Sequence, residues 1–423
     1  MTPTINNEHK ELNFSSEREQ SQAYLNSAEH EKDQGRKVLN VPNLRFKEFQ
    51  GEWEKCKLSE ICTFFSGGTP SSSIKDFYGG NIAFIRSGEL HADSTELFIT
   101  QAGFDSSSAK MVEVGDLLLA MYGATSGDIA VSKIKGAINQ AILCIRTKQN
   151  KKFIESVWNK HVSKNLRKYL QGGQGNLSAD IVKGISFSFP TLKEQEKIAN
   201  LVFLLDERIA TQNKIIEDLK KLKSAIIEKH YGQVKKQTTR IADLGEPFSV
   251  GSLAKDDLVE IGSPCVIYGE LFTTYGEIIF HIESYTNKTD GMTLSKKGDL
   301  LFPSSTTVDA MSLIAPSVIN VDGVVLGGDM FGIHISHNYN AQYLSYYFNH
   351  IAKKQLAKFA KGSTIIHLHY TDIEKAKLLL PSLEEQNRMA KCLVALDKKV
   401  SVEQNLLSSL TCQKSYLLQQ MFI

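Results

Sequence analysis

Residues 189–209 read FPTLKEQEKIANLVFLLDERI, and residues 380–400 read LPSLEEQNRMAKCLVALDKKV, so the chain contains one segment twice. Pro190 corresponds to Pro381, an offset of 381 − 190 = 191 residues that holds without a gap to the last residue. Each copy opens with a capping box, T-x-x-E or S-x-x-E, in which a hydroxyl and a carboxylate satisfy free amide groups at a helix start. We therefore expect a long helix to begin at each copy.

Beyond each cap, apolar residues recur at alternating steps of three and four, which is the heptad pattern of a coiled coil. Polar residues interrupt the two patterns at matching places, Gln212 with Glu403 and Lys223 with Lys414. Polar residues in such a seam weaken it but fix its register, so we expect the two helices to be partners. Two unrelated amphipathic surface helices would not share both the caps and the interruptions. The predicted seam consists of Val202, Leu205, Ile209, Ile216, Leu219, Leu393, Leu396, Val400, Leu407 and Leu410.

Before each predicted helix, short β-like runs alternate with turn signals and one further helix, which indicates an α/β (α+β) domain. The first of these stretches contains RSGEL at 86–90 and GDLL at 115–118, and the second contains IYGEL at 267–271 and GDLL at 298–301. The order is therefore domain, helix, domain, helix. The predicted boundaries are a disordered polar tail at 1–38, domains at 39–190 and 237–380, and helices at 191–236 and 381–423.

The composition indicates a globular protein, with 423 residues, a net charge of +2 and a pI near 8.0. That pI is below the value of about 9 that is typical of domains that bind nucleic acid unaided, so such a role must rest on local chemistry or on partners. No apolar run approaches about 18 residues, and the N-terminus lacks a signal-peptide layout, so we expect a cytoplasmic protein. The six cysteines show no C-x-x-C spacing and are expected to be reduced.

Catalytic signatures are missing from the sequence. It contains no G-x-x-x-x-G-K-[ST] loop, G-x-G-x-x-G fingerprint, H-E-x-x-H pair or G-x-S-x-G elbow. The glycine-rich residues 171–176 follow a predicted helix, which favours a helix C-terminal turn over a phosphate site. His367 and His369 have a spacing compatible with a metal, but no third ligand is near, which favours a structural or DNA-contacting role. We predict no catalytic residue and no metal site.

Several loops carry hydroxyls, amides, free backbone N–H groups near glycines, and lysines, which are groups that contact phosphates and base edges. Ordinary turn chemistry explains each loop alone about as well, but the loops recur at corresponding places in both halves, which favours DNA contact. The candidate DNA-binding residues are Thr69, Ser71, Ser72, Lys75, Arg86, Tyr122, Thr125, Ser126, Gln174, Asn176, Tyr268, Ser304, Ser305, Thr306, Lys361, Ser363, Thr364 and His367.

A combination of short motifs resembles one known family. They are VPNLRFKEFQGEWEKCKLSEI at 41–61, F-x-S-G-G-T-P ending at Pro70, GDLL in both halves, the repeated P-[TS]-L-x-E-Q, and the terminal LLQQMFI. From about residue 39 to the end, the chain resembles the specificity subunit of a type I restriction-modification system. The resemblance implies two target-recognition domains, each reading one part of a split DNA sequence, held apart by an antiparallel pair of long helices.

The resemblance also implies that the chain catalyses nothing and holds no cofactor. Its partners would be double-stranded DNA, two modification subunits that use S-adenosylmethionine to methylate adenine, and restriction subunits that hydrolyse ATP with Mg and cut DNA. Two other classes of function stay open. One is a self-contained DNA methyltransferase or nuclease, against which the missing motifs count, and the other is a scaffold coil with protein-binding domains.

Overall fold

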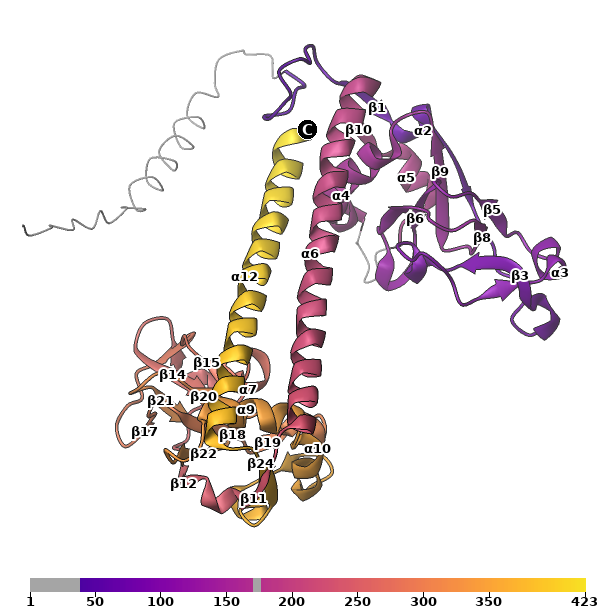
Figure 1. Cartoon of the computed structure of the whole chain (residues 1–423). Helices are drawn as coiled ribbons and strands as arrows, with labels where there is room; N and C mark the ends of the chain where they lie inside the picture. Colours follow the sequence, from indigo (N-terminus) through magenta and orange to yellow (C-terminus); the bar gives the residue numbers. More distant parts are fainter. Residues whose placement is uncertain (1–38, 170–175) are drawn as a thin grey trace, which may run out of the picture. The chain divides into compact units, whose positions relative to one another are not determined.

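The computed structural model describes residues 39–169 and 176–423; the predicted tail at 1–38 lies outside them. The chain divides into two compact units, one formed by residues up to Leu204 together with Gln413–Ile423, and the other by Leu205–Cys412. Each unit contains one α/β domain and part of two long helices, α6 (Leu192–Gln233) and α12 (Leu383–Met421). Figure 1 follows the chain through these elements. The predicted mixture of α/β domains and long helices is confirmed.

Domain 1, the α/β domain of the first unit, is built from two four-stranded sheets; domain 2 is the α/β domain of the second unit. The only parallel pair within them is β3 with β8, and the remaining neighbours are antiparallel. The first sheet has the order β2 (Cys62–Ser66), β9 (Ile142–Thr147), β6 (Leu117–Ala120), β7 (Ile129–Val131), and the second β4 (Phe98–Ile99), β3 (Tyr78–Ile85), β8 (Gly136–Ile138), β5 (Lys110–Val112). The helices are α2 (Leu58–Ile61), α3 (Gln101–Asp105), α4 (Lys151–Tyr169) and α5 (Ala179–Gly184).

Domain 2 repeats this plan with two five-stranded sheets. One sheet has the order β12 (Gly245–Ser249), β22 (Met330–Ile335), β18 (Asp299–Pro303), β20 (Ser317–Ile319), β15 (Ile278–Ile279). The other has the order β13 (Leu258–Val259), β16 (Ser284–Thr286), β14 (Ser263–Ile267), β21 (Val325–Gly327), β17 (Thr293–Leu294). The helices are α7 (Glu270–Thr273), α8 (Ala310–Leu313), α9 (Ala341–His350), α10 (Lys353–Leu356) and α11 (Tyr370–Ile373).

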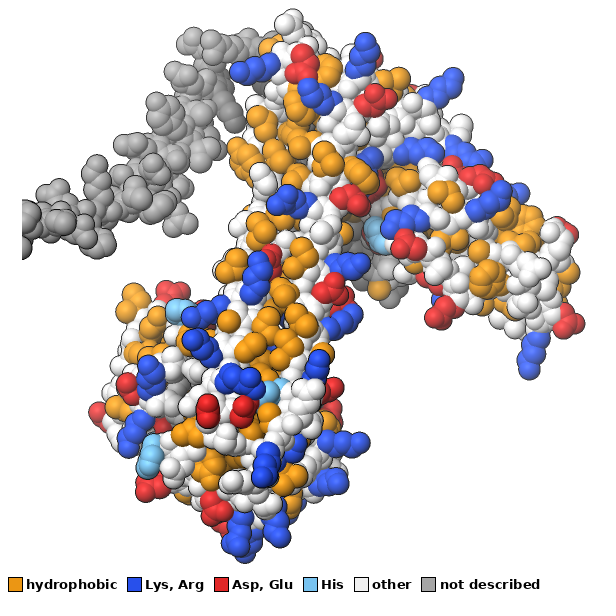
Figure 2. All heavy atoms as spheres, viewed as in Figure 1, with side chains coloured by type: hydrophobic (Ala, Val, Ile, Leu, Met, Phe, Trp, Pro, Cys, Tyr) orange, Lys and Arg blue, Asp and Glu red, His pale blue; other side chains and the backbone are white. Residues whose placement is uncertain are grey.

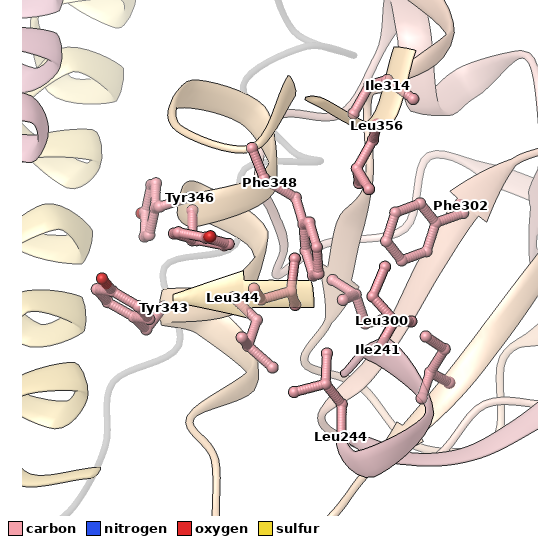
Figure 3. Packing of buried hydrophobic residues seen from close by; sticks show 14 of the residues in the cluster. Ile241, Leu244, Leu300, Phe302, Ile314, Tyr343, Leu344, Tyr346, Phe348 and Leu356 are labelled. Carbon is pink, nitrogen blue, oxygen red and sulfur yellow. The ribbon is translucent and has the colours of Figure 1, made fainter. Parts of the chain in front are cut away.

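The GDLL segments form the central strands of both domains, and their side chains alternate between two cores. In β18, Leu300 and Phe302 pack with residues of α9 such as Phe348 (Figure 3). Leu301 packs instead in the core shared with the second sheet. The alternation follows from the two-residue period of a strand. In β6, Leu117 and Leu118 likewise pack in two different cores. A strand buried on both faces explains why the segment is apolar without interruption.

The glycine and aspartate of each GDLL segment form the turn that starts the strand. Gly115 and Gly298 have φ of +89° and +96°, a backbone region that side chains with a Cβ rarely adopt. The buried Asp116 accepts a hydrogen bond from the Glu113 amide at 3.0 Å and pairs with Arg146 at 2.7 Å. Asp299 likewise accepts from the Lys296 amide at 2.8 Å. The repeated motif is therefore structural.

Each domain is closed by a short antiparallel pair of strands next to a long helix. β1 (Glu54–Lys57) pairs with β10 (Ser186–Phe189), and β11 (Gln237–Arg240) pairs with β24 (Lys377–Leu380). Because β10 and β24 lead directly into α6 and α12, the first and last strands of each domain are held together where the long helix begins.

The predicted capping boxes form only in part. The hydroxyls of Thr191 and Ser382 accept hydrogen bonds from the amides of Glu194 and Glu385, both at 3.4 Å, as expected. The two carboxylates, however, bind other side chains. Glu194 binds the Arg45 guanidinium and the Trp53 indole, and Glu385 binds His230 and Arg388. Distant partners that the fold brings close, together with the local Arg388, replace the capping contact.

The repeated glutamine, Gln195 or Gln386, connects each long helix to its own domain. The side-chain amides of Gln195 and Gln386 donate to the carbonyls of Pro190 and Pro381, both at 2.9 Å. Their side-chain oxygens accept from the amides of Asn150 and Asn340, at 3.1 and 3.0 Å. These asparagines cap the helices α4 and α9. We call this arrangement the glutamine clamp; it accounts for the glutamine that both copies share.

The two long helices pair within the second unit, as predicted. Gln212 donates to the Glu403 backbone carbonyl at 3.0 Å and also to the Glu403 carboxylate. Contacts later in α6 meet earlier positions in α12, with Lys223 at Asp397 and His230 at Glu385, so the helices are antiparallel. Each of the ten predicted seam side chains is buried or half-buried. With 42 and 39 residues, the helices are slightly shorter than the predicted ranges 191–236 and 381–423.

Candidate nucleic-acid interface

Two groups of candidate residues from domain 2, far apart in sequence, meet in the structure. Strand β19 (Ser305–Thr306) pairs with β23 (Ile366–His367), with Ser305 opposite His367. The Leu368 amide donates to the Ser304 carbonyl at 2.9 Å, and Lys361 and His367 exchange backbone hydrogen bonds at 2.9 and 2.7 Å. The segments 304–309 and 361–369 therefore form one surface, which we call the domain 2 loop cluster.

Domain 1 brings the corresponding loops together through the same backbone contacts. The Leu177 amide donates to the Met121 carbonyl at 2.8 Å, as Leu368 does to Ser304. The amides of Met121 and Ser304 in turn donate to the carbonyls of Ala141 and Asp329, both at 2.7 Å. The domain 1 loop cluster thus consists of residues 122–128 and Asn176. Gln174 lies outside the described residues.

The loop before β3 joins the domain 1 cluster. The Thr69 hydroxyl donates to the side-chain oxygen of Gln140. The next residue, Ala141, accepts the backbone hydrogen bond of Met121. Gly67 is buried against the Ile138 carbonyl, and a Cβ added at Gly67 would lie 1.8 Å from that oxygen. Only a glycine at this position of the S-G-G-T-P motif lets the two backbone segments lie so close together. Beyond this anchor, Ser71, Ser72 and Lys75 are exposed.

Comparison with known proteins assigns the two domains to a family. The model of the type I restriction modification DNA specificity domain matches residues 50–221 and 238–411. The chain belongs to this family. It contains two specificity domains.

Individual relatives agree with this assignment. The specificity subunit of the type I restriction enzyme MjaVIII of Methanocaldococcus jannaschii is 22% identical over 393 residues, with 85% of this chain and 90% of that protein covered. The EcoR124I/EcoR124II specificity subunit of Escherichia coli is 29% identical over 187 residues, with 42% of this chain and 45% of that protein covered. The S subunit of a type I system from M. genitalium has a similar fold, with a TM-score of 0.61, 15% identity, and 90% and 99% of the two chains covered.

The candidate residues in the loop clusters differ in how far they reach solvent. Ser304 and Ser305 are only 3% and 7% exposed and support the loops from inside. Ser126 is half-buried and donates to the Met121 carbonyl at 3.0 Å. Thr125 and Thr306 are half-buried as well. The exposed candidates are Tyr122, Asn176, Lys361, Ser363, Thr364 and His367.

Two further candidates belong to the GEL motifs and have local partners. The Arg86 guanidinium pairs with Glu89 at 3.0 Å, and the hydrogen bond that it donates to Glu89 raises the pKa of Arg86. Tyr268, at the neighbouring position of the second motif, is half-buried against a hydrophobic core. In both motifs the glutamate accepts a backbone amide three residues back at 3.0 Å, so the repetition reflects a shared turn.

Sequence reasoning missed two features of specificity domain 2. The short 3-10 helix η1 (Lys75–Phe77) has a counterpart in η5 (Lys255–Asp257), and the Lys-Asp pair that starts each is the signal that could have found Lys255. Val308 and Ile365, 71% and 49% exposed, project from the domain 2 loop cluster. A search for polar groups overlooks them, although apolar side chains contact the thymine methyl group in the major groove.

The rings of His367 and His369 stack with their centroids 6.2 Å apart, and both side chains are exposed. Within residues 39–169 and 176–423, no group of three or more His, Cys, Asp or Glu side chains is arranged to hold a metal ion. Among the described helices, none is both long and apolar enough to cross a membrane.

Proposed function

We propose that this chain is the non-catalytic DNA-reading subunit of a type I restriction-modification complex, and that each specificity domain reads one half of a bipartite sequence. The observation that carries the proposal is the convergence of equivalent loops in both domains through the same backbone contacts, as between Leu177 and Met121 and between Leu368 and Ser304. A common scaffold with different loop residues suits two readers of different sequences.

The two loop clusters offer different chemistry to DNA. Domain 1 presents hydroxyl and amide groups, such as Thr69 and Asn176, together with the half-exposed ring of Tyr122. Domain 2 presents the charged Lys361, the stacked histidines and the apolar Ile365. Hydroxyls and amides pair with base edges, lysine with phosphates or guanine, and apolar groups with thymine methyls. The two half-sites should therefore differ.

The partner subunits in this proposal supply the chemistry. Two modification subunits would use S-adenosylmethionine to methylate adenine, and restriction subunits would use ATP and Mg to translocate and cut DNA. The long helices offer a surface for such partners, because Leu204, Val402 and Tyr416 are 64%, 59% and 59% exposed. Hydrophobic side chains are visible along the long helices in Figure 2. Contiguous apolar patches on a protein surface are typical of protein contact sites. Large partners would also neutralise phosphates, which fits the net charge of +2.

The test is to map methylated adenines across a genome with and without this chain, in the presence of its modification subunit. The proposal expects one bipartite motif that disappears with the chain. Lys361→Ala combined with His367→Ala should alter or weaken recognition of one half-site only, whereas Lys354→Ala, an exposed lysine outside the loop cluster, should change nothing. Loss of both half-sites in the double variant would contradict separate reading.

Two controls address the other classes of function. Purified chain that transfers methyl groups without a partner would identify a self-contained methyltransferase. If the chain with its modification subunit binds DNA containing the mapped motif no better than random DNA in fluorescence anisotropy, the domains would be protein-binding modules on a scaffold.

A further inference from the structure

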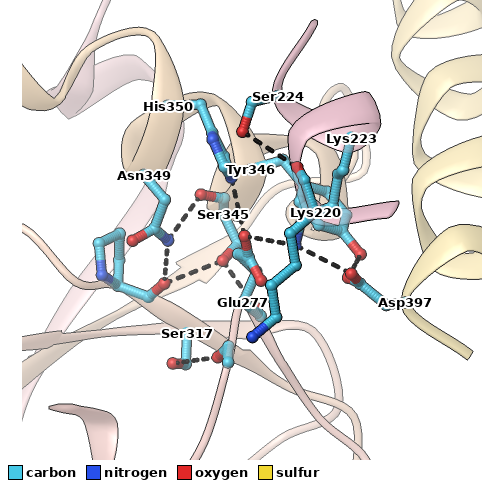
Figure 4. A network of polar contacts seen from close by, with 12 residues as sticks. Lys220, Lys223, Ser224, Glu277, Ser317, Ser345, Tyr346, Asn349, His350 and Asp397 are labelled. Atoms are coloured by element: carbon cyan, nitrogen blue, oxygen red, sulfur yellow. Dashed lines mark hydrogen bonds and ion pairs between the residues drawn. The ribbon is translucent and has the colours of Figure 1, made fainter. Parts of the chain in front are cut away.

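The polar interruption at Lys223 is the centre of a network that joins three parts of the second unit. The Lys223 ammonium, on α6, lies 2.9 Å from Glu277 Oε1 and 2.9 Å from Asp397 Oδ1 (Figure 4). Asp397 belongs to α12, and Glu277 belongs to domain 2, just before β15. The Lys223 side chain is 12% exposed, so one buried charge connects both long helices with the domain.

Each carboxylate in this network has a second partner from α9. His350 Nε2 lies 2.8 Å from Glu277 Oε1, and the hydroxyl of the fully buried Tyr346 donates to Asp397 Oδ2. The Tyr346 ring also lies beneath the Lys223 ammonium, 5.5 Å from ring centroid to nitrogen. We call these five residues the Lys223 network.

The Lys223 network constrains the orientation of domain 2 relative to the two long helices in a way that the surrounding apolar contacts do not. Ile226, Ile227 and Tyr231 of α6 also pack against the core of domain 2. Hydrophobic contact is non-directional, so such side chains tolerate small rotations of one body against another. Buried charges must keep their partners at hydrogen-bonding distance, because an unpaired one is strongly unfavourable. Lys223 can satisfy Glu277 and Asp397 together only in a narrow range of orientations.

Domain 1 has a different side chain at the position equivalent to Tyr346. Counting from the capping asparagines, Tyr346 is six residues after Asn340, and Ser156 is six residues after Asn150. Ser156 donates only to the Lys152 carbonyl within α4, at 2.8 Å. The tyrosine of the Lys223 network therefore has no counterpart at this position of domain 1.

We propose that Lys223, acting through Glu277 and Asp397, is a positioning residue that sets the orientation of specificity domain 2 on the helix pair and thereby fixes the number of base pairs between the two half-sites. The inference rests on the proposed function. The Lys223 network contacts no DNA in this scheme; it determines where the reading loops of domain 2 are held.

The experiment measures the gap in the methylated motif. The main variant combines Lys223→Met, Glu277→Gln and Asp397→Asn, which removes all three charges but keeps the size of the side chains, and Tyr346→Phe removes only one hydroxyl. The matched control is Lys220→Met, because Lys220 is exposed on the same helix. Genome-wide mapping of methylated adenines gives the distribution of gap lengths for each complex.

The proposal expects both variants to keep the two half-site sequences but to methylate sites whose gap is one base pair longer or shorter, at least about five times more often than the wild type, with the triple variant showing more than Tyr346→Phe. The control should match the wild type. If both variants keep the single wild-type gap, even at reduced methylation, the network is only a stabilising contact and the proposal is wrong. A wild-type complex without any bipartite motif would instead overturn the proposed function.

Discussion

Replacing Gln386 by alanine should loosen domain 2 from the start of α12 without affecting domain 1. Gln386 is 1% exposed and makes two hydrogen bonds, to the Pro381 carbonyl at 2.9 Å and from the Asn340 amide at 3.0 Å. The alanine variant leaves the buried Pro381 carbonyl and the half-buried Asn340 amide without these partners, at about 1–3 kcal/mol each. Because the smaller side chain leaves room for a water molecule, we expect a loss of about 2–4 kcal/mol in the local free energy of opening.

Native-state hydrogen exchange read by mass spectrometry localises this loss. Amides of 341–350 in α9 and of the first turns of α12 should exchange about 30 to 1,000 times faster, the equivalent of 2–4 kcal/mol. Amides of α4 in domain 1 should not change. Gln195→Ala should speed exchange in α4 and leave α9 unchanged. Gln404 is an exposed glutamine on α12, and Gln404→Ala should change exchange in neither domain. Equal loosening of both domains by Gln386→Ala, or a change below about 0.5 kcal/mol, would refute the glutamine clamp.

Three further outcomes test other parts of the structure. Exchanging residues 239–380 for those of a relative should change one half of the methylated motif; a change in both halves would show that the domains do not read independently. Leu205→Asp with Leu396→Asp should abolish complex assembly, because two seam carboxylates lose water at a cost of several kcal/mol, and pull-down of the modification subunit checks this. Burial alone would raise the pKa of Glu277, but bonds from His350 and Lys223 lower it from 4.5 to about 2. Glu277 should therefore contribute about 3 kcal/mol to the free energy of unfolding above pH 5, and this contribution should be lost as the pH falls towards 2. In urea unfolding, the difference in free energy of unfolding between the wild type and Glu277→Gln should therefore decrease as the pH falls.

The long helices could be predicted from the sequence because their signals are local and repeated. A heptad pattern indicates which side chains of a helix face its partner helix. The matched interruptions at Gln212 and Glu403 indicate that the partner helix is the one formed by the other copy of the repeat. The structure adds that these two residues bind each other. The fate of Glu194 was not predictable, because Arg45, its ionic partner, lies 149 residues earlier and no local pattern connects them.

The candidate interface was predictable only as a set of loops. Glycine, serine and threonine indicate turns, but they do not indicate which turns lie next to each other in the fold or which hydroxyls remain exposed. Ser304 and Ser363 look alike in sequence, yet one is buried beneath the loop and the other faces solvent, because only Ser304 follows directly on a central strand. Burial of this kind depends on tertiary packing, which residue type alone does not encode.

The contact between Gln212 and Glu403 has a consequence for self-association. The two residues occupy the same position of the repeat, since 403 − 212 = 191 is the repeat offset. If α12 paired in the same antiparallel register with α12 of a second molecule, Glu403 would meet another Glu403, and two carboxylates would face each other in a buried seam. Pairing of α6 with α12 replaces one of these acids by a neutral amide donor. A single difference between the copies thus favours the intramolecular helix pair over homodimers exchanged through α12.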